Sequence, residues 1–402
     1  MSNYLSDQQY IALKVEAAEN TPITPDVFLP LISEGIVSDL GRSPDERIAG
    51  LDWKSDDLLK GRHLHGGPVE LYADPDTLGH IFNMFYKKGA TGGDAAVGYT
   101  HPFTAANPKS YTIEIAKGLY AQRYWGVKAN NLKLEFDNNK LKASIDIKAV
   151  GQFSTATLAV ALTGADMTEA VFNQDYILKP TEGLVAGDVV VIGGVDVTIT
   201  VVEADGVTIT FAATTVTSDI GGSVYLKKQT YTTPDPVLQD PLFEGNTLIG
   251  VGVDETAATT ASGAKATATP FQEFVIELKN NLFEQAASGQ HDPIKILPKM
   301  KEGRILTKKL FADVDQHRKW IDKTKQAITL ISKGRFIKTD RTTWDELSFK
   351  FHKVKLNPNS NPLEVGEYIY DNQEFDILYD RTDVKAITLS LVNRTSGVAY
   401  GD

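Results

Sequence analysis

A strand-rich segment occurs twice in this sequence, about 230 residues apart. The first copy, from Val127 to Val150, reads VKANNLKLEFDNNKLKASIDIKAV, and the second, from Val354 to Asp380, begins VKLN and ends NQEFDILYD. Each copy is preceded by a short strand that runs into an Ala-Asp helix start: ELYADPDTLGHIFNMF after Val69, and KKLFADVDQHRKWI from Lys308. Internal similarity of this kind predicts two copies of one strand–helix–strand–strand unit.

The first copy has a well-marked helix signal. Asp74 is a suitable N-cap and Pro75 a suitable first helical residue. Apolar side chains then follow at helical spacing, at Leu78, Ile81, Phe82 and Phe85. Between residues 111 and 149 the hydrophobic period becomes two, which predicts strands with one apolar and one charged face. An equivalent second helix is expected between about Ile305 and Lys325.

The segment between the two copies has a different texture. Residues 157–233 are rich in Val, Thr, Gly and Ala, with turns at Gly193-Gly194 and Ala204-Asp205-Gly206, which predicts a small all-β module. The predicted domains are therefore an N-terminal arm and first domain at 1–156, the inserted module at 157–233, and a linker and second domain at 234–402. Residues 255–269 are low in complexity and are expected to form a flexible loop. The predicted fold class is mainly β with a minor α content.

Composition excludes some classes of function. The 402 residues contain no cysteine, so disulfides and thiolate metal sites are excluded. The formal net charge of −11 argues against tight binding to a phosphate backbone, while an acidic surface could still face DNA without adsorbing to it. The N-terminus lacks the pattern of a secretory signal, and no stretch approaches the apolar length of a membrane span, so no membrane partner is expected.

The sequence contains no recognisable catalytic constellation. Nucleotide-binding glycine motifs and the G-x-S-x-G nucleophile motif are absent. His63 and His65 form an H-x-H pair that could bind zinc with a carboxylate, but two solvated loop histidines are the favoured interpretation. His80 is expected to be a packing residue beside the helix stripe, and His291-Asp292 to mark a turn. We therefore predict a protein that is not an enzyme, with no cofactor, catalytic or metal site.

Three segments together resemble the tail tube protein (major tail protein) of bacteriophages with long, non-contractile tails. They are KVEAAENTPITPDVFLPLISEGI, YTIEIAKGLYAQRYWGVKANNLKLEFDNNKLKASIDIKAVGQF and FVIELKNNLFEQAASGQHDPIKILPKMKEGRILTKKLF. With the C-terminal strands, the likeness covers roughly two thirds of the chain and omits the module near 157–233. The resemblance implies duplicated β-sandwich or split-barrel domains, each with a flanking helix, whose sheets join edge to edge around a lumen.

The resemblance also implies partners and locations. Stacked rings would form the tube for DNA ejection, with one chain supplying two units, so a trimer with pseudo-six-fold symmetry is favoured over a hexamer. Other tail proteins (tape measure, terminator and baseplate), and passing DNA without specific binding, are the remaining partners. The chain would reside in the virion tail, after assembly in the host cytoplasm.

The same resemblance suggests where functional residues lie. The arm from Lys14 to Leu31 and the loop from Gly35 to Gly67 take the places that bridge successive rings. Candidates for inter-ring contact are Val15, Phe28, Leu31, Leu51 and Trp53. Candidates for the lumen-facing set, taken from the charged faces of predicted strands, are Lys133, Glu135, Lys142, Asp146, Lys350 and His352.

Other functions remain open at this point. One alternative is another tail component with the same fold, such as a tube terminator or baseplate hub, which copy number would distinguish. A second is a carbohydrate-binding or hydrolytic protein on a β scaffold, which requires a cleft with paired acids. The inserted module could also bind a host surface while the rest of the chain forms the tube.

Overall fold

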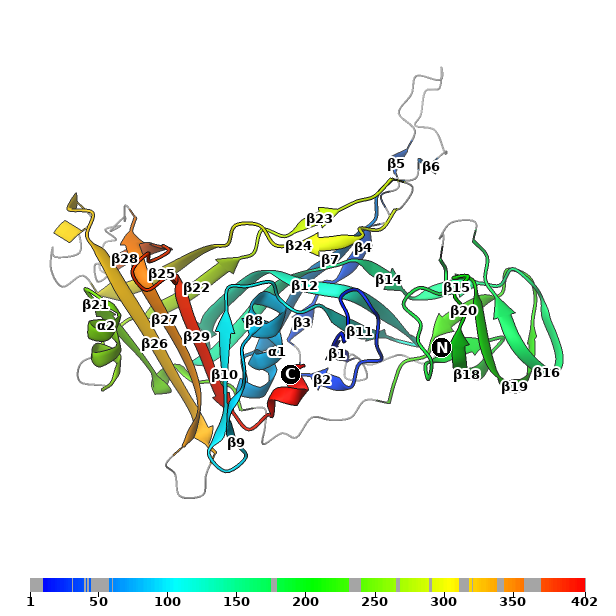
Figure 1. The fold of residues 1–402 in the computed structure, drawn as a ribbon, viewed down its shortest axis with the longest axis horizontal. Coiled ribbons are helices and arrows are strands. Elements are labelled where there is room, and N and C mark those ends of the chain that lie inside the picture. The colour runs from blue at the N-terminus through cyan, green and yellow to red at the C-terminus, as the bar shows by residue number, and fades with distance from the viewer. Residues whose placement is uncertain are drawn as a thin grey trace, which may run out of the picture.

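The computed structural model is mainly β and elongated, with two α-helices in the part of the chain that it describes (Figure 1). The described residues are 10–30, 32–39, 41, 43–44, 58–59, 61–174, 179–230, 240–264, 268–288, 291–310, 318–319, 321–337, 343–357 and 370–401. A large sheet of 19 strands contains strands from both halves, and a second sheet of six strands lies at one end of the molecule. Among these residues, no helix is long and apolar enough to cross a membrane.

The first half contains a set of strands with a defined pairing order. In chain order they are β1 (Ile11–Val15), β4 (Val37–Asp39), β7 (Leu64–Tyr72), helix α1 (Pro75–Phe85), β11 (Tyr111–Lys117), β12 (Tyr120–Asp137), β13 (Lys140–Ala149) and β14 (Gly151–Phe153). All their pairings are antiparallel and run β1–β11–β12–β13–β7–β4, with β14 also on β12.

The second half repeats this order. Its strands are β21 (Thr247–Gly252), β22 (Glu273–Lys279), β25 (Glu302–Leu310), β26 (Lys325–Phe336), β27 (Trp344–Leu356), β28 (Tyr370–Ile377) and β29 (Ile387–Asn393). They pair as β21–β26–β27–β28–β25–β22, with β29 also on β27. The two series correspond strand for strand, so the fold is duplicated. The second predicted helix falls between β25 and β26, mostly outside the described residues.

The two halves are joined directly by strand pairing. Strand β12 of the first half pairs with β22 of the second, from Asn131↔Lys279 to Glu135↔Val275. Strand β10 (Gly98–Thr104) pairs with β29. The remaining short strands are β2 (Val27–Leu29), β3 (Ser33–Glu34), β5 (Ser43–Pro44), β6 (Leu58–Leu59), β8 (Lys87–Lys88), β9 (Gly92–Asp94), β23 (Phe283–Gln285) and β24 (Lys295–Leu297). Short 3₁₀ turns occupy Glu244–Asn246 and Gly397–Tyr400.

Helix α1 forms where the sequence predicts it and lies in the shared core. The Asp74 carboxylate accepts hydrogen bonds from the backbone N–H groups of Asp76 and Thr77, at 3.0 and 2.8 Å, so the helix is capped. The ring of Phe82 makes an edge contact with Phe349 of the second half, with centroids 5.7 Å apart. One apolar cluster therefore includes side chains of α1 and of both sets of strands.

Helix α2 (Glu255–Ser262) corrects one prediction, because this stretch was expected to be a flexible loop. Asp254 caps the helix by accepting a hydrogen bond from the Ala257 N–H at 2.8 Å. A Cβ at Gly250 of β21 would lie 2.0 Å from the Ala258 carbonyl oxygen, so the helix packs directly against glycine backbone. The run of small residues that looked like low complexity is what allows this close approach.

The six-stranded sheet lies between residues 155 and 226, and we refer to this part as the module. Its strands are β15 (Thr155–Thr157), β16 (Leu162–Val171), β17 (Val189–Ile192), β18 (Val195–Val202), β19 (Thr208–Ser218) and β20 (Ser223–Leu226). Its apolar core continues onto the large sheet through Trp125 of β12. It also includes Leu282 and Ile296, which lie beside and within the separate β23–β24 pair. The module is therefore anchored by packing as well as by the chain.

Candidate functional site

A polar face runs across seven neighbouring strands of the large sheet, opposite the face that packs on α1. Successive cross-strand neighbours along one row of this face are Glu70, Ser144, Lys133, Glu277, Arg304, Asp376 and Lys355. Apart from the serine, the charges alternate in sign, so each charged side chain has an opposite charge beside it. The row crosses from the first half to the second between Lys133 and Glu277, at the β12–β22 joint.

Ion pairs along this polar face are short. The Arg304 Nε donates to a Glu277 oxygen at 2.6 Å, which raises the pKa of the guanidinium. Lys142 lies 3.1 Å from Glu70, and this hydrogen bond lowers the pKa of the Glu70 carboxyl. Because these side chains are partly exposed, each pair contributes little stability, and the alternation mainly keeps the face close to neutral.

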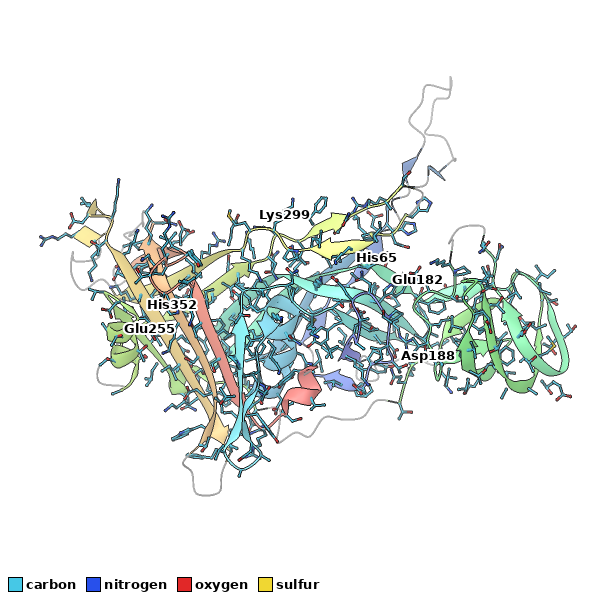
Figure 2. The ribbon with its side chains drawn as sticks, in the orientation of Figure 1. His65, Glu182, Asp188, Glu255, Lys299 and His352 are labelled. Atoms are coloured by element: carbon cyan, nitrogen blue, oxygen red, sulfur yellow. The ribbon has the colours of Figure 1, made fainter. Side chains whose placement is uncertain are left out.

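Four of the six predicted lumen residues lie together on the polar face. Lys133, Glu135, Lys142 and Asp146 come from the facing strands β12 and β13. Lys350 and His352 lie on β27, the strand that carries Lys355 at the end of this row, and Figure 2 labels His352. Lys350 Nζ is 2.6 Å from Glu255 of α2, and the His352 ring contacts Asp383 and Thr388 at 2.8 and 2.7 Å. The charge pattern alone gave no indication that α2 lies beside this part of β27.

The predicted inter-ring residues are described only in part. Val15 is half-buried against the main core, and Phe28 packs edge-on against Tyr10 with centroids 5.1 Å apart. Leu31, Leu51 and Trp53 lie outside the described residues.

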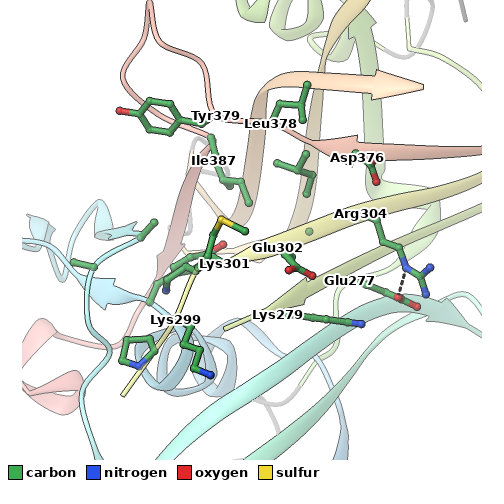
Figure 3. A pocket seen from close by; sticks show the side chains of 18 of the residues that line it. Glu277, Lys279, Lys299, Lys301, Glu302, Arg304, Asp376, Leu378, Tyr379 and Ile387 are labelled. Carbon is green, nitrogen blue, oxygen red and sulfur yellow. Dashed lines mark hydrogen bonds and ion pairs between the residues drawn. The ribbon is translucent and has the colours of Figure 1, made fainter. Parts of the chain in front are cut away.

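A hollow of about 1000 Å³ opens beside β22, β25 and β28 (Figure 3). Its lining includes Glu277, Arg304 and Asp376 of the polar face. Burial lowers the pKa of Lys301, also in the lining, to about 8. This ammonium donates to the Phe85 carbonyl at 3.1 Å and lies 4.5 Å from the centre of the Tyr86 ring. Lys301 therefore completes the C-terminal end of α1, as cations near helix ends commonly do.

The H-x-H pair is buried, which corrects the prediction of two solvated loop histidines. His63 and His65 are 6% and 5% exposed, and each has a ring nitrogen 2.9 Å from the same oxygen of Asp292. Asp292 lies 227 residues from His65 and arrives through the fold of the second half. Sequence spacing could not indicate this partner. His80, expected to be a packing residue, is buried against Tyr400 with centroids 4.7 Å apart.

A second buried polar cluster lies where the module meets the large sheet. The Arg123 guanidinium donates two hydrogen bonds to Asp188, at 2.5 and 2.8 Å, and another to Glu114 at 2.8 Å. All three side chains are at most 3% exposed. Tyr10 completes the cluster by donating to Glu114 at 2.7 Å. Arg123 thus joins β12 of the large sheet to the module through a paired charge.

The sequence was compared with protein-family models and with curated proteins. No family model and no curated protein matches it.

Proposed function

We propose that this chain is a structural subunit of a bacteriophage-type tail tube, which assembles into stacked rings around a channel. The observation that carries the proposal is the joint between the two copies of the fold. Strand β12 of the first copy pairs along its edge with β22 of the second, so the chain contains one example of how one unit can join the next. Repetition of that joint between chains would extend the sheet into a closed ring.

The free edge of the first copy supports this assembly. Strand β4 is the first-copy equivalent of β22. β4 pairs with β7, the strand before α1, and β22 pairs with β25, the strand before the second predicted helix. β22 has β12 on its other side, whereas within the described residues β4 pairs only with β7. Val37 on this edge is 64% exposed. An open edge with an exposed apolar side chain favours pairing with another strand.

The polar face is suited to line the channel. Its charges alternate in sign, so the face has little net attraction for a polyanion and would let DNA pass without specific binding. With two copies of the fold in one chain, three chains would supply six units, which favours a trimeric ring. Tape measure, terminator and baseplate proteins remain the expected partners, and a virion tail the expected location.

Electron microscopy of the purified protein at rising concentration tests the proposal. We expect hollow tubes or stacked rings with three-fold symmetry. Val37→Lys should prevent ring formation, because a lysine on an edge strand opposes edge-to-edge pairing. Val201→Lys is the matched control, since Val201 is also an exposed strand valine (47%) but lies in the module. Rings that never stack would favour a terminator or hub, and unchanged assembly of Val37→Lys would contradict the proposed edge.

A further inference from the structure

Two long connections that occupy equivalent places in the two copies meet at one point. The connection between β4 and β7 ends at His63, and the connection between β22 and β25 contains Asp292. The His63 backbone N–H donates to the His291 carbonyl at 2.9 Å, and Arg62 donates to the Glu284 carbonyl at 2.6 Å. The two connections are thus already held together beside the sheet.

Three possible metal ligands converge at this meeting point. His63 Nδ1 and His65 Nε2 are each 2.9 Å from Asp292 Oδ1, and the three ligand atoms lie within 4.8 Å of one another. Ligands of tetrahedral zinc at about 2.0–2.2 Å from the ion are separated by about 3.3 Å. The two measured nitrogen–oxygen distances therefore need to lengthen by only a few tenths of an ångström to hold an ion.

The surroundings of His65 are those of a metal-binding histidine. Its second ring nitrogen, Nδ1, lies 2.9 Å from the Ser38 hydroxyl. When Nδ1–H donates to the Ser38 hydroxyl, the Nε2 lone pair points at the negative Asp292 carboxylate, and the two repel each other. A cation between these two groups removes the repulsion. A metal-bound histidine usually has such an oxygen partner on its other nitrogen, which sets the tautomer and ring orientation. The ring is buried, so little water competes for the position.

Another acidic group lies near the three ligands. Burial raises the pKa of Glu182 in the module, while the positive charge of Lys179 lowers it and the negative charge of Asp292 raises it. Figure 2 shows Glu182 on the module side of His65.

We propose that His63, His65 and Asp292 form a zinc site that ties together the long connections of the two copies. Two imidazoles and one carboxylate are a ligand set that zinc accepts, with a water in the fourth position. An ion here would reduce the freedom of both connections relative to the sheet. The inference rests on these contacts and stands or falls independently of the tube proposal.

The test uses the full-length chain without a histidine tag, stripped of metal with EDTA and titrated with ZnCl₂. We expect one zinc per chain by elemental analysis and a higher melting temperature when zinc is added. His65→Ala and Asp292→Asn should lose the stoichiometric zinc. Ser38→Ala should weaken binding by about 10- to 100-fold, the usual effect of removing an outer-shell partner.

The control is His352→Ala. His352 also contacts an aspartate, Asp383 at 2.8 Å, but among the residues that the structure describes no second histidine joins them, so this variant should still bind one zinc per chain. Circular dichroism of each metal-free variant establishes that it is folded, and His63→Gln replaces any variant that is not. The visible spectrum of the Co²⁺-loaded protein should show tetrahedral coordination. Wild-type protein that binds no zinc, or full binding by folded Asp292→Asn, would overturn the proposal.

Discussion

Replacement of Asp188 by alanine tests how the module is fixed to the large sheet. The Asp188 carboxylate accepts two hydrogen bonds from Arg123, one from the Val185 N–H at 2.8 Å and one from the Thr24 hydroxyl at 2.9 Å. In Asp188→Ala, Arg123 keeps Glu114 but loses its bidentate partner in a buried site. Removal of one partner of a buried ion pair costs about 3–5 kcal/mol, because the other charge remains buried.

Urea unfolding followed by tryptophan fluorescence measures this loss. Trp125 is 4% exposed and belongs to the apolar cluster that the module and the sheet share, so its emission reports on this junction. The control is Asp26→Ala, which breaks the exposed Lys14–Asp26 pair, whose side chains are 35% and 59% exposed. Such a pair contributes about 0–1 kcal/mol. If Asp188→Ala loses no more than the control, the buried charge is not what fixes the module.

Three further variants address the core, α2 and a turn. Burial lowers the pKa of His80 to about 3, so between pH 6.5 and 3 the unfolded chain takes up a proton that the folded chain does not. The free energy of unfolding therefore decreases as the pH is lowered below about 6.5. At pH 5 this group has reduced it by about 2 kcal/mol. His80→Phe should remove this contribution to the difference in stability between pH 7 and pH 5, measured by urea unfolding at each pH. An unchanged difference would contradict the role of His80. Gly250→Val should lower the free energy of unfolding by about 1–3 kcal/mol or more, because its side chain overlaps α2. Gly245→Ala should change the free energy of unfolding little, because Gly245 has open space around it. Equal losses in Gly250→Val and Gly245→Ala would refute the packing argument. Asn139 has φ +67° in the β12–β13 turn, so Asn139→Ala should cost about 1 kcal/mol in thermal unfolding; a neutral result would mean that the turn relaxes.

The sequence was most informative where local pattern and fold agree. The N-cap and proline at Asp74-Pro75 predicted α1, and alternation of apolar residues predicted the strands from Tyr111 to Ala149. The duplication, weak in residue identity, is clear in strand pairing. Hydrophobic periodicity reflects burial on one face of an element, which is a local property, and this explains why it could be read directly.

The sequence was least informative where two distant segments meet. Helix α2 has few large apolar residues, so its pattern resembled a loop, and only the glycines of β21 explain how it packs. The pairing of His63 and His65 with Asp292 depends on two connections that meet across the sheet. Likewise, Lys350 repeats the alternation seen at Lys133, yet its neighbour is Glu255 of α2. Such contacts come from tertiary structure and leave no periodic signal.

Strand β12 has a mechanical consequence. Its 18 residues include Arg123 and Trp125, at the base of the module, and the stretch from Asn131 to Glu135 that pairs with β22. Only Ser154 separates β14 from the first strand of the module, so no slack lies on that side. A push or pull on the module would thus be transmitted along β12 to the joint between the two copies, and the bend at Gly126 (φ +63°) and the irregular register between Ala129 and Asn131 are where a tilt of one copy against the other would be taken up.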